Sequence, residues 1–143
     1  MSILYRIAKD EGIALDLWDG IVTADEYLAS VQRLIDDTNW PPHRHLHLGD
    51  LQTALLDPSL DESALRRVAA IYGQHLDILA KTKSAIVANE AFARSLFFQQ
   101  LMTSSVSMVV FNDLSTACRW LGVETDWAGC VLSEMRAELR SRQ

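Results

Sequence analysis

Two short apolar segments, Ala85–Ala88 and Met108–Phe111, constrain the fold of this 143-residue chain more than any other feature of its sequence. Neither segment alternates between apolar and polar residues. A strand has this pattern when both of its faces are buried, as in a parallel sheet that is covered by helices. The segments between the strands have helical spacing, and strands separated by helices imply crossover connections. The chain is therefore predicted to be an α/β protein.

Three further segments, Ile3–Ile7, Ile13–Leu17 and His45–Leu48, alternate in hydropathy and are predicted to be strands. The first two are joined by Lys9–Gly12, an acidic and glycine-containing turn that is typical of a hairpin. The hairpin adds an antiparallel strand at one edge. We therefore predict a mixed, mostly parallel sheet of about five strands.

The predicted helices begin at capping sequences. Thr23–Glu26 and Ser59–Glu62 match the capping box, so Thr23 and Ser59 are the predicted N-caps. Asp126 is the predicted cap of a C-terminal helix, and Gly122 ends the helix before it. The predicted helical ranges end near residues 38, 80, 102, 121 and 139. Without repeats or linkers, residues 1–143 are expected to form a single domain.

Composition excludes several classes of protein. A hydrophobic fraction of 49% is too high for a disordered chain, and two cysteines are too few for a disulfide scaffold. With 19 acidic and 13 basic residues, a nucleic-acid partner is not expected. There is neither an apolar run that could span a membrane nor a signal peptide, so a cytoplasmic protein is expected.

Two segments and the order of elements suggest a family. Trp18–Glu26 and Val110–Gly122, together with the topology of residues 3–122, resemble the SpoIIAA-like family of small bacterial proteins. This STAS/Sec14-like class includes anti-sigma-factor antagonists. The resemblance implies a SpoIIAA-like (STAS) fold, to which this chain adds a C-terminal helix.

The same resemblance suggests a modification site. In anti-sigma-factor antagonists a partner kinase phosphorylates a serine at a helix N-terminus after the third strand. The resemblance places Ser59 at that position, although Pro58 replaces the family's first serine and no glycine follows Ser59. Ser59 is therefore a possible phosphoacceptor. The alternative is that Ser59 only caps its helix, with Glu62 three residues later.

His43, His45 and His47 would project from one side of an extended strand, a spacing at which two imidazoles can share a zinc ion. Asp50 or His75 could supply a third ligand. The alternative is that these histidines are solvated or bond to backbone carbonyls. We predict no cofactor and retain the three histidines only as candidate metal ligands.

No catalytic motif is present. The sequence contains neither a Gly-x-Ser-x-Gly segment nor a glycine-rich phosphate loop. Cys118 and Cys130 are interpreted as small buried groups. Four carboxylates surround the first crossover, and a structural role is favoured for them: Asp16, Asp19, Asp25 and Glu26. A protein without enzymatic activity is therefore expected.

One predicted helix has apolar residues that extend beyond a single stripe: Phe92, Phe97, Phe98, Leu101 and Met102. Such excess apolar surface favours a dimer or an internal cavity. We predict a STAS-like regulatory or protein-interaction module that forms a homodimer through this helix or the C-terminal helix. The alternative is a Sec14-like carrier of a small apolar or amphipathic ligand, with Leu51–Leu56 as a pocket wall or lid.

Overall fold

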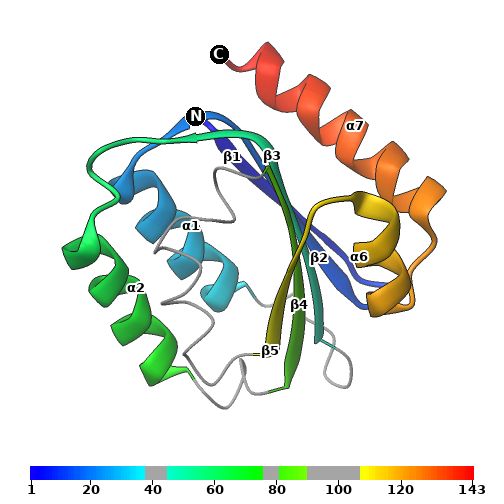
Figure 1. Ribbon diagram of the computed structural model, residues 1–143, viewed down its shortest axis with the longest axis horizontal. Coiled ribbons are helices and arrows are strands. Elements are labelled where there is room, and N and C mark those ends of the chain that lie inside the picture. Colours follow the sequence, from blue (N-terminus) through cyan, green and yellow to red (C-terminus); the bar gives the residue numbers. More distant parts are fainter. Residues whose placement is uncertain (38–44, 76–80, 90–106) are drawn as a thin grey trace.

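The computed structural model describes residues 1–37, 45–75, 81–89 and 107–143. They form one five-stranded sheet in the order β1-β2-β3-β4-β5 (Figure 1). The strands are β1 (Ile3–Ala8), β2 (Ile13–Val22), β3 (His45–Leu56), β4 (Thr82–Ala88) and β5 (Ser107–Phe111). β1 pairs antiparallel with β2, and the other neighbours pair in parallel. The predicted mixed, mostly parallel sheet is confirmed.

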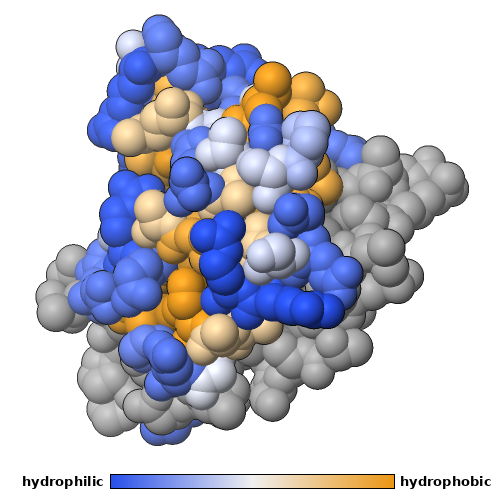
Figure 2. All heavy atoms as spheres, turned by 90° about the vertical axis from the view of Figure 1, so that its left-hand side faces the viewer, coloured by the Kyte–Doolittle hydropathy of each residue, from blue (hydrophilic) through white to orange (hydrophobic). Residues whose placement is uncertain are grey.

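Helices cover both faces of this sheet (Figure 1). α1 (Ala24–Asp36) and α2 (Glu62–Gln74) lie on one face, and α6 (Leu114–Leu121) and α7 (Thr125–Ser141) lie on the other. The predicted C-terminal helix is thus present as α7. On the side where α1 and α2 lie, hydrophobic residues emerge between hydrophilic ones (Figure 2). The helix predicted up to residue 102 falls outside the described residues.

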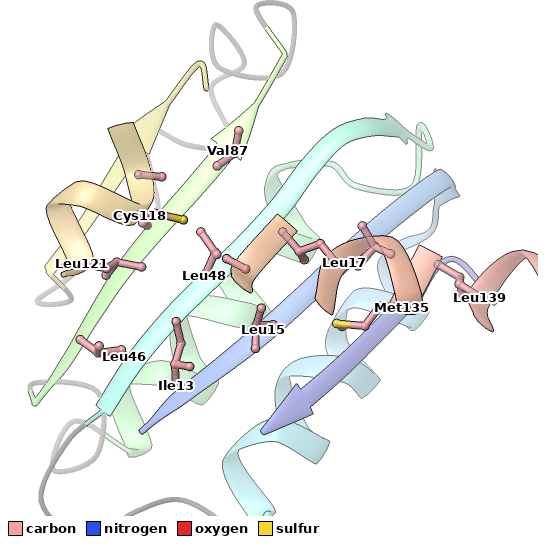
Figure 3. Packing of buried hydrophobic residues seen from close by; sticks show 14 residues of the cluster. Ile13, Leu15, Leu17, Leu46, Leu48, Val87, Cys118, Leu121, Met135 and Leu139 are labelled. Atoms are coloured by element: carbon pink, nitrogen blue, oxygen red, sulfur yellow. The ribbon is translucent and has the colours of Figure 1, made fainter. Parts of the chain in front are cut away.

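The core consists of one apolar cluster on each face. Beneath α6 and α7, Leu15 and Leu17 of β2 pack with Met135 and Leu139 of α7 (Figure 3). The cluster beneath α1 and α2 contains Trp18, Val22, Tyr27, Leu51, Leu65, Val68 and Ile86. Successive residues of β4 enter opposite clusters, which confirms that this strand is buried on both faces.

The start of α1 ties the helix to β1. The Thr23 hydroxyl accepts a hydrogen bond from Glu26 N at 3.3 Å, which confirms the predicted cap. The Glu26 carboxylate, however, does not return to Thr23. It accepts instead from the amide and hydroxyl of Ser2 and from Ile3 N. The Glu26 carboxylate, which is one half of the predicted capping box, therefore attaches the start of β1 to the start of α1.

Two other predicted caps are wrong. α2 begins at Glu62 with Asp61 as its N-cap, whose carboxylate accepts from Ala64 N at 3.0 Å, so Ser59 does not cap this helix. α7 begins at Thr125 after Glu124, and Asp126 lies inside its first turn.

Gly122 does end α6, as predicted, in the left-handed conformation at φ 76°. Cys118 is buried, but Cys130 is exposed, which corrects its prediction. The buried stripe of α7 consists of Ala128, Leu132, Met135 and Leu139, and Cys130 lies outside it.

Candidate interaction surface

β2 and β3 extend beyond their neighbours as a two-stranded projection. β1 pairs with β2 only as far as Trp18, and β4 pairs with β3 only as far as Leu51. Beyond these points, Asp19–Val22 pairs with Thr53–Leu56, and we call these eight residues the projection. The predicted lid at Leu51–Leu56 is therefore wrong, because these residues belong to a hydrogen-bonded strand.

A β-bulge sets the orientation of the projection. Leu17 faces Asp50 and Asp19 faces Thr53, so β3 contains one residue more than β2 over this stretch. The Asp50 carboxylate accepts from Gln52 N at 3.1 Å and thereby provides a partner for an amide at the bulge. Bulges bend a strand and increase its local twist.

The two faces of the projection differ in exposure. Ile21 and Leu55 are paired in register and are 61% and 60% exposed. On the opposite face, Val22 and Ala54 are 0% and 1% exposed, and Leu56 is partly buried. Among the described residues, Met1, at 58%, is the only other large hydrophobic side chain that is exposed to a similar degree. The Ile21–Leu55 pair is thus an apolar surface that the described chain does not cover.

Helix α7 holds the base of the projection through ion pairs. Arg140 Nε lies 2.8 Å from Asp19 Oδ2, and the Thr53 hydroxyl donates to Asp19 Oδ1 at 2.7 Å. The Arg140 hydrogen bond, helped by Thr53, holds the pKa of Asp19 below its usual value despite burial. Next to it, Arg136 contacts Asp50 at 3.1 Å. These contacts bring α7 to the base of the exposed pair without covering the pair.

The buried apolar stripe of α7 packs against the sheet of its own chain. Leu132, Met135 and Leu139 are at most 2% exposed, because they pack on the protein's own sheet (Figure 3). The predicted dimer surface on this helix therefore offers a second copy mainly polar side chains. The other predicted surface, Phe92 to Met102, lies outside the described residues.

Ser59 lies in the turn that follows the projection. Its hydroxyl accepts from Ala24 N at 3.0 Å, so it provides a partner for the first amide of α1, whose N-cap is Thr23, and does not cap α2. Its amide donates to Asp57 Oδ1, and the Asp57 amide donates to Val22 O at the end of the projection. The Ser59 hydroxyl and amide lower the pKa of Asp57. Ser59 is exposed, so a modifying enzyme could reach it.

The predicted metal ligands that lie within the described residues do not come together. His43 lies outside the described residues, whereas His45 and His47 begin β3. Asp50 belongs to the opposite face of the sheet, where it contacts Arg136 rather than His47. His75 caps the C-terminus of α2. No three metal-binding side chains within the described ranges are arranged to hold an ion.

The exposed pair itself was not predicted. Its signal is weak, because Ile21-Val22 and Leu55-Leu56 are short apolar pairs after strands that already look complete. Only the pairing of β2 with β3 shows that Ile21 and Leu55 are exposed, whereas Val22 is buried and Leu56 is partly buried.

Comparison with known proteins identifies the fold. No family model and no curated protein matches the sequence. The chain is similar to a solved structure of an uncharacterized protein from the DUF3478 family, with a SpoIIAA-like fold, from Shewanella loihica PV-4. The TM-score is 0.53 at 15% identity, over 84% of this chain and 92% of that one. The predicted SpoIIAA-like fold is confirmed. No helix in the described part of the chain has the length and apolar character to cross a membrane.

Proposed function

We propose that residues 1–143 form one non-enzymatic, STAS-like module that regulates by protein interaction, and that it binds a second copy of itself through the projection. The exposed Ile21–Leu55 pair carries this proposal. Contiguous apolar surface, rather than a single exposed apolar residue, marks interaction sites, and Ile21 and Leu55 are neighbours across β2 and β3. The bulge and the arginine contacts with α7 hold this pair in a defined position.

A symmetric contact suits the shape and chemistry of the pair. In a two-fold dimer, the same surface of both copies meets, so Ile21 of one copy faces Leu55 of the other. Covering the exposed parts of four such side chains contributes roughly 1–2 kcal/mol each. Because the costs of association offset much of this gain, the dimer is expected to be weak and dependent on concentration.

Ser59 supplies the regulatory element of the proposal. Its hydroxyl bonds to Asp57, and the Asp57 amide bonds to the end of the projection. A phosphate on Ser59 would place about two negative charges beside the Asp57 carboxylate. Repulsion between them opens the turn and changes how the Ile21–Leu55 pair is presented.

Sedimentation velocity from about 1 μM to about 1 mM tests the interaction surface. The wild type is expected to dimerise with rising concentration, and the double variant Ile21→Thr/Leu55→Thr is expected to stay monomeric. Threonine keeps the preference for strand structure while removing apolar area. Gln52→Thr, at another exposed position of β3, is the matched control and is expected to behave as the wild type.

A wild type that is monomeric throughout this range overturns the proposed self-association. A double variant that dimerises as tightly as the wild type places the interface elsewhere and overturns the proposed surface. The variant Ser59→Asp tests regulation separately, and it is expected to associate more weakly than both the wild type and Ser59→Ala. Equal association of Ser59→Asp and Ser59→Ala contradicts the role of Ser59 alone.

A further inference from the structure

A second set of polar side chains lies on the other face of the sheet, away from the Ile21–Leu55 pair. Tyr5, Asp16, His47 and Ser84 come from four adjacent strands, and we call them the polar band. Tyr5 faces Asp16 across β1 and β2, and His47 faces Ser84 across β3 and β4. Their neighbours along the strands belong to the apolar cluster beneath α6 and α7, so the polar band lies beneath α1 and α2.

The contacts within the polar band leave two polar atoms without a partner. His47 Nδ1 lies 2.7 Å from Ser84 Oγ, and Trp18 Nε1 donates to Asp16 Oδ2 at 3.1 Å. His47 Nε2 is 3.7 Å from Asp16 Oδ2, which is beyond hydrogen-bond length. Within the described residues, His47 Nε2 and Asp16 Oδ1 are both buried and have no hydrogen-bond partner.

Two such atoms in one place need an explanation. Each buried polar group that lacks a partner costs about 1–3 kcal/mol, and such groups are uncommon in native proteins. The nearby phenols do not satisfy them, because the Tyr27 hydroxyl bonds to that of Tyr72. Burial, followed by the charges around it, including that of Asp16, raises the pKa of Tyr27.

The order Ser84–His47–Asp16 is that of a nucleophile, a base and an orienting carboxylate. This arrangement does not favour acyl transfer. Ser84 is only 3% exposed and lies within β4, which pairs with a strand on either side. Its backbone amide is therefore held in the sheet and cannot stabilise an oxyanion. The side chains of Asp16 and His47 are each 13% exposed, whereas the two unpartnered atoms, Asp16 Oδ1 and His47 Nε2, are themselves buried.

We propose that Asp16 and His47 form a binding site for the hydroxyl group of a small neutral alcohol or polyol. The Asp16 carboxylate favours the His47 tautomer with its proton on Nε2, and Nδ1 then accepts from the Ser84 hydroxyl. The site thus presents a donor at Nε2 beside an acceptor at Asp16 Oδ1. A hydroxyl group satisfies both, because it donates and accepts at once.

Other ligand classes fit less well. A carboxylate cannot donate to Asp16, carboxylates and phosphates are both repelled by its charge, and an ammonium group cannot accept from His47 Nε2. This inference is independent of the proposed function, since it involves neither the projection nor Ser59.

Glycerol is a suitable probe, with acetate and ethylammonium as the anionic and cationic comparisons. The measurement is the ¹⁵N chemical shift of His47 Nε2 in uniformly labelled full-length protein. Glycerol is expected to shift this resonance saturably with a dissociation constant of about 1–100 mM. The two ions are expected to cause no saturable shift. His75, at the C-cap of α2, is an internal control for solvent effects.

The variant Asp16→Asn tests the acceptor. With Trp18 donating to the amide oxygen, the amide nitrogen replaces Asp16 Oδ1 and offers a donor where the ligand needs an acceptor. Binding of glycerol is expected to weaken at least about tenfold. Asp10→Asn, in the exposed turn after β1, is the matched control and is expected to bind glycerol as the wild type does. Ser84→Ala is a second variant, expected to weaken binding because the His47 tautomer loses its partner.

No saturable shift of His47 in wild-type protein overturns the proposal, because water alone then satisfies the two atoms. The proposal also fails if acetate binds as well as glycerol, or if Asp16→Asn and Ser84→Ala both bind glycerol as tightly as the wild type does.

Discussion

Arg140 Nε lies 2.8 Å from Asp19 Oδ2, although the two residues are 121 positions apart in the sequence. The contact joins the end of α7 to β2 at the base of the projection. Asp19 is 7% exposed, so its charge depends on this partner and on the Thr53 hydroxyl. A buried carboxylate with such partners couples stability to pH.

Asp19→Asn is expected to lower the free energy of unfolding by about 1–2 kcal/mol at pH 7. Because folding lowers the pKa of Asp19, the contribution of the wild-type carboxylate is full above its unfolded value near 3.9 and is lost as the pH falls through its folded value. Urea unfolding of both proteins between about pH 7 and pH 2 checks this. A difference that persists unchanged at the acid limit contradicts the prediction.

Gly20 adopts φ 85° in β2, and a Cβ there meets no atom within 4 Å. Gly20→Ala is therefore expected to destabilise by about 1–2 kcal/mol through backbone strain alone. Gly73→Ala, in α2 with equal space but ordinary φ, is expected to stabilise by up to about 1 kcal/mol. Thermal unfolding of the two variants should shift in opposite directions. Equal shifts would show that φ at Gly20 carries no strain.

The parts of the fold that follow from local pattern were predictable from the sequence. The uninterrupted apolar run of β4 predicts burial on both faces, and Gly122 predicts the end of α6. The cap of α2 does not follow from local pattern, because serine and aspartate are both favoured at the N-cap and the sequence offers Ser59 and Asp61. The choice between them depends on Ala24, which lies in another helix and whose amide donates a hydrogen bond to the Ser59 hydroxyl.

The candidate sites could not be predicted in the same way, because they depend on register. The bulge in β3 comes from one extra residue between Asp50 and Thr53 relative to β2. The sequence of neither strand by itself shows that β3 has one residue more than β2 over this stretch. The polar band likewise combines Asp16 and His47, which come from different strands and are ordinary polar residues when each is considered alone.

Glu26→Gln tests the bond between α1 and β1. The Glu26 carboxylate accepts from Ser2 and Ile3, and an amide with one acceptor oxygen cannot replace all of these contacts. A loss of about 1–2 kcal/mol is expected, with faster hydrogen exchange at the Ile3 amide. Asp25→Asn, the exposed neighbour, is the control and should cost less than about 0.5 kcal/mol. Equal losses in both variants would assign the effect to the helix dipole.

Ser59→Ala and Asp61→Ala distinguish the two caps. Ser59→Ala is expected to speed hydrogen exchange at the Ala24 amide, and Asp61→Ala is expected to do so at the Ala64 amide. Each should lower stability by about 0.5–2 kcal/mol. If Ser59→Ala instead increased exchange at Ala64, Ser59 would be the cap of α2 after all.

The packing of α7 also determines when the protein can complete its core during synthesis. Leu15 and Leu17 lie in β2, near the start of the chain, whereas Met135 and Leu139 that cover them lie in the last described helix. A ribosome adds about 5–20 residues per second, so several seconds pass between the synthesis of β2 and the synthesis of the α7 residues that bury Leu15 and Leu17. Until α7 emerges, the nascent chain presents an open apolar sheet face, which is the kind of surface that molecular chaperones bind.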